Sequence, residues 1–147
     1  RVVLGDARVS MAREVRERAP TYDLIVLDAF SSDAIPVHLL TREALGVYLE
    51  RLAPGGRIAV HVSNRYLDLE PVVAALARER GLAARVGAWG IPQVLRYHNL
   101  STWIVLARDD WDLGMLATDA RWRPVREERG VRAWTDDHSS ILDVFTW

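Results

Sequence analysis

The stretch that most constrains the fold is a buried-strand pattern that runs directly into an acidic loop. Residues 24–27 form an unbroken apolar run, which is typical of a strand in a parallel sheet covered on both faces. Asp28 follows at the strand end, and residues 29–36 have the composition of a loop. Ligands of open α/β sheets lie at the carboxyl ends of strands, which favours Asp28 as a site residue. A turn or helix cap is an equally good interpretation of this acid.

The rest of the chain alternates between strand and helix patterns. We expect strands at residues 2–4, 24–27, 57–62, 83–88 and 102–107, and helices at residues 10–18, 42–52, 70–80 and 109–122. Ser10 and Thr41 are candidate N-caps, Gly81 is a candidate C-cap, and the Pro-Gly-Gly at 54–56 predicts a turn. This order predicts an α/β protein with crossover helices, whose last two strands form an antiparallel hairpin.

Composition narrows the function classes. The 147 residues are enough for one domain with its own core, and the formal net charge of -1 argues against a nucleic-acid partner. The chain has no cysteine, which excludes disulfides and thiolate chemistry. All 19 basic side chains are arginine, so lysine Schiff bases and P-loop lysine chemistry are excluded as well. No apolar run is long enough to span a bilayer and no signal peptide is present, so we expect a cytoplasmic chain.

Polar residues follow three of the expected strands. Asp6 comes after the first, Asp28 after the second, and Ser63 and Asn64 after the third. Because carboxyl ends of parallel strands share one sheet edge, we expect these side chains to form a site there.

The sequence lacks the motifs of metal sites, of hydrolase nucleophiles and of phosphate-binding loops. The four histidines are not spaced for a metal site, so we expect no bound metal, and His61 is interpreted as a core or sheet-face residue. Neither a nucleophile elbow nor a glycine-rich phosphate loop is present.

Several motifs resemble the spermidine synthase family. They are Gly5-Asp6-Ala7, the loop from Asp28 through Ser31 and Asp33, the Pro-Gly-Gly at 54–56, and the segments 61–69 and 134–139. The resemblance implies the C-terminal part of a Rossmann-like class I S-adenosylmethionine-dependent methyltransferase sheet, mostly parallel with a terminal antiparallel hairpin. It covers residues 1–147 as one partial catalytic domain and implies that the family's first two strands lie upstream. The last two segments are similar to bacterial spermidine synthase-like proteins, some of which carry an added membrane domain.

The resemblance also implies roles for individual residues. Asp28 is similar to the family's catalytic aspartate, which orients and deprotonates an amine. The implied nucleoside-binding residues are Gly5, Asp6 and Ala7, and the implied acceptor-binding residues are Ser31, Asp33, Ser63, Asn64 and Tyr66. One departure is the pair Ala29-Phe30, which separates Asp28 from the serines and changes the register of the loop.

The implied reaction transfers an aminopropyl group from decarboxylated S-adenosylmethionine to a polyamine acceptor such as putrescine. An alkylamine has a pKa of about 10.4 and arrives protonated, so a carboxylate is needed to hold it and remove a proton. The alternatives are a small-molecule methyltransferase that uses S-adenosylmethionine, and a non-catalytic domain of the same fold. A homodimer and a membrane domain in a longer parent protein remain open as partners.

Overall fold

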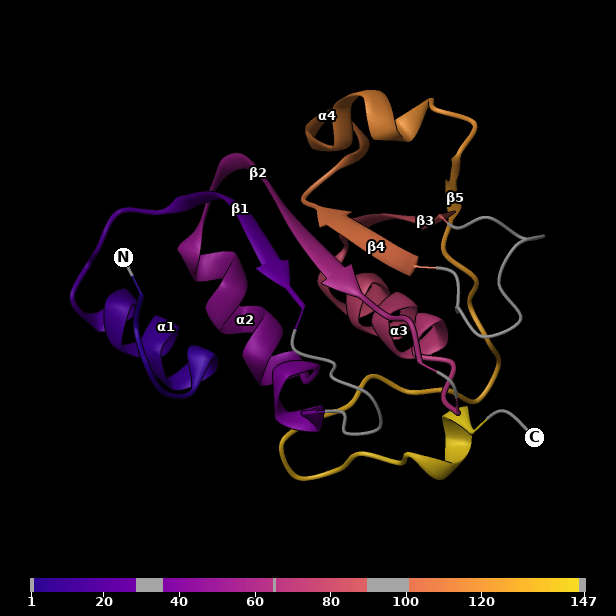
Figure 1. The fold of residues 1–147 in the computed structure, drawn as a ribbon, viewed down its shortest axis with the longest axis horizontal. Coiled ribbons are helices and arrows are strands. Elements are labelled where there is room, and N and C mark those ends of the chain that lie inside the picture. The colour runs from indigo at the N-terminus through magenta and orange to yellow at the C-terminus, as the bar shows by residue number, and fades with distance from the viewer. Residues whose placement is uncertain (1, 29–35, 65, 90–100, 146–147) are drawn as a thin grey trace.

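A computed structural model describes residues 2–28, 36–64, 66–89 and 101–145 (Figure 1). The helices are α1 (Ala7–Arg16), α2 (Arg42–Arg51), α3 (Glu70–Arg80) and α4 (Asp110–Leu113), with 3₁₀ turns at Val37–Leu39, Gly114–Ala117 and Leu142–Val144. The strands are β1 (Tyr22–Leu27), β2 (Leu52–His61), β3 (Ala83–Trp89), β4 (Ser101–Ala107) and β5 (Trp122–Pro124). The expected α/β class is confirmed.

The five strands form one mixed sheet in the order β1-β2-β4-β3-β5. Strands β1 and β2 are parallel and are joined through α2, while the β2–β4, β3–β4 and β3–β5 pairs are antiparallel. The expected hairpin is confirmed by β3 and β4, which pair from Ala83 opposite Ala107 to Trp89 opposite Ser101. Parallel pairing is therefore confined to β1 and β2 in the part of the chain that the structure describes, so the sheet there is not mostly parallel.

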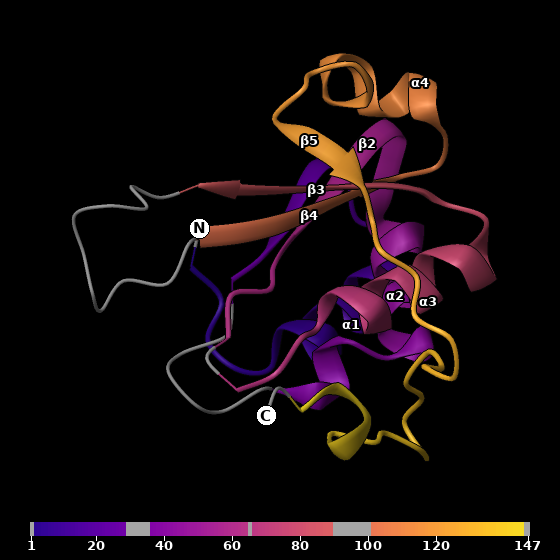
Figure 2. The ribbon, with the colours of Figure 1, turned by 90° about the vertical axis from the view of Figure 1, so that its right-hand side faces the viewer.

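The two faces of the sheet are covered differently. Helices α1, α2 and α3 lie on one side of the sheet, and α4 lies on the other (Figure 2). The main core fills the first side. Ile25 of β1, Ile58 of β2 and Ile104 of β4 belong to this core, together with residues of α2 and α3. On the second side Leu113 of α4 packs on Val105, but Leu24 and Val26 of β1 stay about half exposed. The second face is thus open at β1, so the expectation that residues 24–27 are covered on both faces is wrong, because β1 is the first strand in the sheet order and α4 packs on the other strands.

The start of the chain differs from the expected pattern. Residues 2–4 were expected to form a strand, but they lie outside the sheet, because no described strand offers them a hydrogen-bonding partner. The first helix begins at Ala7 rather than at Ser10. Its cap is Asp6, whose Oδ1 accepts a hydrogen bond from the backbone N–H of Val9 at 2.9 Å.

Two further local predictions are corrected and two are confirmed. The Pro-Gly-Gly at 54–56 lies inside β2 as a bulge, since Tyr22 pairs with Leu52 while Leu24 pairs with Arg57. The helix expected at 109–122 ends at Leu113, because Gly114 follows with a φ of +60° and breaks the helical hydrogen bonding. The caps Thr41 and Gly81 are confirmed. Within the described residues, no helix is long and apolar enough to cross a membrane.

Candidate active site at the ends of β1 and β2

Asp28 and His61 meet where the two parallel strands end. Leu27 pairs with Val60 in the ladder, so the next residue along each strand, Asp28 and His61, is placed side by side. His61 Nδ1 lies 2.8 Å from Asp28 Oδ1. The Asp28 side chain is 57% exposed and that of His61 is 20% exposed, so the acid faces solvent while its partner is held inside the site.

The imidazole of His61 is fixed on two further sides. Its Nε2 lies 2.8 Å from the hydroxyl of Ser63, and that hydroxyl accepts a hydrogen bond of 2.7 Å from the backbone N–H of Thr102. The ring also stacks on Trp103, which is its register partner on β4, with 4.8 Å between ring centroids and 19° between planes. Three strands therefore hold one histidine against one exposed carboxylate.

The remaining polar residues after β2 shape the loop beside this pair. Asn64 Oδ1 accepts hydrogen bonds from the backbone N–H groups of Tyr66 and Leu67, both at 2.9 Å, which forms a tight side-chain turn. Ser63 and Asn64 line a cavity of about 600 Å³ together with Thr102, Glu70, Arg121 and Arg123. Tyr66 is 42% exposed on the same loop.

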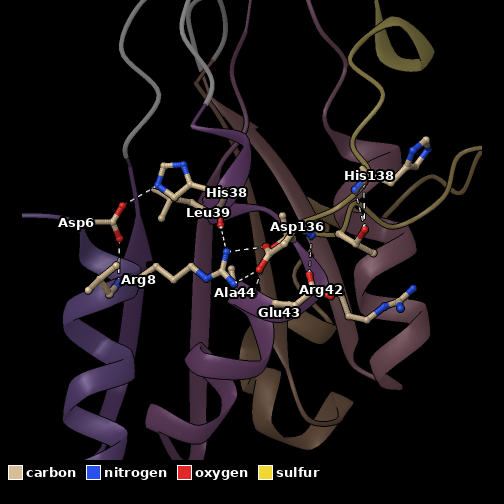
Figure 3. Close-up of polar contacts among 12 residues, drawn as sticks. Asp6, Arg8, His38, Leu39, Arg42, Glu43, Ala44, Asp136 and His138 are labelled. Atoms are coloured by element: carbon tan, nitrogen blue, oxygen red, sulfur yellow. Dashed lines mark hydrogen bonds and ion pairs between the residues drawn. The ribbon is translucent and has the colours of Figure 1, made fainter.

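A second polar cluster forms around the first turn of α1 (Figure 3). Asp6 Oδ2 lies 2.9 Å from His38 Nε2, so both carboxylate oxygens of Asp6 have partners within the chain. The N–H of Val9 and the side chain of His38 hold the pKa of Asp6 below its usual value. Arg8 forms a two-pronged ion pair with Asp136, at 2.7 and 2.5 Å, and also donates to the carbonyl of His38 at 3.1 Å.

Asp136 brings the C-terminal segment to this cluster. Its Oδ1 accepts a hydrogen bond from the Thr41 hydroxyl at 2.8 Å, and its backbone N–H donates to Glu43 at 3.0 Å. The Arg8 guanidinium is the main reason that the pKa of Asp136 lies below its usual range. Arg8, His38, Thr41 and Asp136 line a hollow of about 430 Å³.

The predicted site residues fall into two groups and a remainder. Asp28 and Ser63 are brought together through His61, and Asn64 and Tyr66 lie on the loop that follows. Gly5, Asp6 and Ala7 lie at the start of α1, where Gly5 and Ala7 border a separate apolar groove beside Tyr22 and Leu24. Ser31 and Asp33 lie outside the described residues.

Sequence reasoning missed His61, which it interpreted as a core or sheet-face residue. The signal that was available is the His-x-Ser spacing at 61–63, which puts both side chains on one face of a strand, next to the strand that ends in Asp28. Arg8, His38 and Asp136 were also missed, because they are far apart in the sequence. Within the described ranges, no three histidine, aspartate or glutamate side chains are placed to hold a metal ion.

Part of the chain is similar in sequence to a known enzyme. No family model matches the chain. Over 66 residues the chain is 45% identical to the polyamine aminopropyltransferase of Vibrio vulnificus (strain CMCP6), a match that covers 45% of this chain and 21% of that protein. The aligned part is thus about a fifth of the curated relative's length.

Among solved structures, the chain resembles MNMC2 from Aquifex aeolicus. The TM-score is 0.46 at 20% sequence identity, and the superposition covers 88% of this chain and 39% of that chain.

Proposed function

We propose that the chain carries the acceptor-binding and catalytic part of an aminopropyltransferase, with Asp28 as the carboxylate that orients and deprotonates the acceptor amine. The observation that carries this proposal is the exposed carboxylate of Asp28 at the carboxyl end of a parallel strand, held by His61 at 2.8 Å. The 66-residue match to a polyamine aminopropyltransferase supports the same assignment. The donor would be decarboxylated S-adenosylmethionine and the acceptor a polyamine such as putrescine.

The proposed step is an in-line displacement at carbon. The acceptor arrives as an ammonium ion, which Asp28 holds by a charge-assisted hydrogen bond. Loss of one proton at the Asp28 site frees the nitrogen lone pair, which attacks the methylene next to the sulfonium. The new N–C bond forms as the C–S bond breaks, and the electron pair leaves on sulfur. The products are a secondary ammonium, a neutral thioether and one released proton.

Roles for the other predicted residues follow from their positions. Ser63 contacts His61, the residue that holds Asp28, and Asn64 and Tyr66 follow it along the chain; we assign all three to the acceptor pocket. We also assign Ser31 and Asp33, which follow Asp28 in the sequence, to this pocket. Gly5, Asp6 and Ala7 are assigned to the nucleoside. Asp6 keeps its two contacts within the chain in this assignment, so its free lone pairs would serve the adenine amino group.

The test is transfer by the purified chain with putrescine, followed by mass spectrometry of the amine product. Decarboxylated S-adenosylmethionine and S-adenosylmethionine are supplied in parallel reactions, so that an added aminopropyl group is distinguished from an added methyl group. Asp28→Asn should lower the transfer rate by about 10²- to 10⁴-fold, as expected for loss of a positioned base. Asp23→Asn is the matched control, since Asp23 is an exposed acid on the same strand. A methylated product, or equal rates for the two variants, would refute the proposal.

A further inference from the structure

His61 is the described residue that links Asp28 to the rest of the sheet. Its two ring nitrogens contact Asp28 and Ser63, both at 2.8 Å, and its ring face lies against Trp103. No other described side chain is hydrogen-bonded to Asp28, and no described group is bonded to its Oδ2. Within the described residues, the orientation of the Asp28 carboxylate therefore depends on its contact with His61.

The hydrogen-bonding capacities of these groups favour one tautomer of His61. An ionised carboxylate only accepts hydrogen bonds, so Nδ1 must carry the hydrogen that faces Asp28. Ser63 accepts from the Thr102 N–H and can donate its hydroxyl hydrogen to Nε2. In the neutral ring the two nitrogens then have complementary partners, with the donor directed at the acid.

From this geometry we infer that His61 is a positioning residue that holds Asp28 through Nδ1 and leaves the second carboxylate oxygen of Asp28 to the acceptor amine. The inference rests on the proposed function and extends it to the residue that orients Asp28. With Asp28 Oδ1 held by His61, Oδ2 remains for the acceptor ammonium. A neutral ring leaves the full negative charge of Asp28 to bind a cation.

Around the ring, the described neighbours are Asp28 from β1, Ser63 after β2, and Trp103 and Thr102 from β4, of which only Asp28 is charged. Among these neighbours, Asp28 is therefore the one charged group that the ring contacts.

Two substitutions of His61 separate positioning from packing. His61→Asn keeps an N–H close to the place of Nδ1 but loses the ring that stacks on Trp103. His61→Phe keeps a flat ring against Trp103 but removes both nitrogens. We expect His61→Phe to lower kcat by about 10- to 100-fold, the usual cost of losing a group that orients a functional side chain, and His61→Asn to retain most of it. A purely structural role predicts the reverse order.

One further readout completes the test. In NMR spectra of the ring nitrogens of the 147-residue chain, His61 should be in the Nδ1–H form, and Asp28→Asn should weaken that preference.

The outcomes distinguish this inference from the function on which it rests. An Nε2–H ring in the unmodified chain, or a kcat for His61→Phe that equals or exceeds that of His61→Asn, would refute the positioning role while transfer itself persists. Absence of transfer by the unmodified chain, together with putrescine binding that Asp28→Asn does not weaken, would refute the proposed function, while the NMR spectra would still decide which tautomer His61 adopts.

Discussion

Glu70 gives the sharpest stability prediction, because its buried carboxylate links α3 to β5 and to the segment that follows β5. Its side chain is 9% exposed. It accepts two hydrogen bonds from Arg123, at 2.6 and 2.8 Å, and one from the backbone N–H of Arg126 at 2.6 Å. Glu70→Gln keeps the size of the side chain but replaces one acceptor oxygen with an NH₂ group that would face the Arg123 guanidinium.

The magnitude follows from these contacts. Hydrogen bonds to a charged group contribute about 1.5–3 kcal/mol each, and removing one member of a fully buried pair costs about 3–5 kcal/mol. Arg123 is 58% exposed, so water can hydrate its guanidinium when Glu70 is replaced. The cost of removing the carboxylate therefore lies at the lower end of these ranges. We expect Glu70→Gln to reduce the free energy of unfolding by about 2–3 kcal/mol, a fall in Tm of roughly 4–12 °C for a chain of this size.

The pH dependence has a definite sign. Burial raises the pKa of Glu70, but the hydrogen bonds from Arg123 and from the Arg126 N–H outweigh it and hold the pKa below its usual value. A carboxylate with a depressed pKa in the folded state stabilises the fold above its unfolded-state pKa and loses that contribution as the pH falls through the folded-state value. The Tm difference between the unmodified chain and Glu70→Gln should therefore be constant near neutral pH and shrink below the usual glutamate pKa of about 4.3.

The assay is thermal melting followed by circular dichroism from neutral to acidic pH. Glu127→Gln is the matched control, since Glu127 is 56% exposed and pairs with Arg78 at 2.7 Å on the surface. Such a pair contributes about 0–1 kcal/mol. Equal melting temperatures for the two variants, or a gap that does not change at acidic pH, would refute the reasoning.

Three other predictions concern groups that fix the framework of the site. Arg51→Ala should lower the free energy of unfolding by about 3 kcal/mol in urea titrations, because this buried guanidinium donates to the carbonyls of Ala19 and Pro20; a loss under 1 kcal/mol would contradict that role. Tyr48→Phe should cost about 1 kcal/mol through its hydrogen bond to the Leu39 carbonyl. Burial raises the pKa of Tyr48, so its hydroxyl should stay protonated in alkaline solution until the protein unfolds. An absorbance titration should therefore count the same number of phenolates in the unmodified chain and in Tyr48→Phe before unfolding. One additional phenolate in the unmodified chain would contradict this prediction. Asp6→Ala should lower the Tm more than Asp23→Ala does, because Asp6 caps α1 and contacts His38, and equal melting temperatures would argue against the cap.

Local patterns predicted the centre of the fold well. The cap Thr41 and the αL glycine Gly81 each act over a few residues, and each has the predicted role. The apolar run at 24–27 forms a strand as predicted, but only one of its faces is covered. The helix expected at 109–122 failed, because a single glycine with positive φ ends it and the sequence does not show which φ a glycine adopts. The strand expected at 2–4 failed because a strand needs a neighbour, which is a property of the tertiary structure.

The sequence predicts which polar residues follow each strand, but it does not predict how these residues contact one another. Asp28 and Ser63 were found because each follows a strand, yet their connection runs through His61, whose role depends on the register of β1 against β2. The cluster of Arg8, His38 and Asp136 joins residues separated by as many as 128 positions, and no local pattern encodes it. A sequence can therefore indicate which side chains end strands, while their pairing is set by the sheet.

The most direct test of the central claim is the affinity of Asp28 for a cationic acceptor. Putrescine binding would be measured by calorimetry in the presence of saturating methylthioadenosine, for the unmodified chain, Asp28→Asn and Asp23→Asn. One charge-assisted hydrogen bond of about 1.5–3 kcal/mol corresponds to a loss of affinity of roughly 10- to 150-fold. We expect that loss for Asp28→Asn and an unchanged affinity for Asp23→Asn, and equal affinity in all three proteins would contradict the role of Asp28 as the group that binds the acceptor.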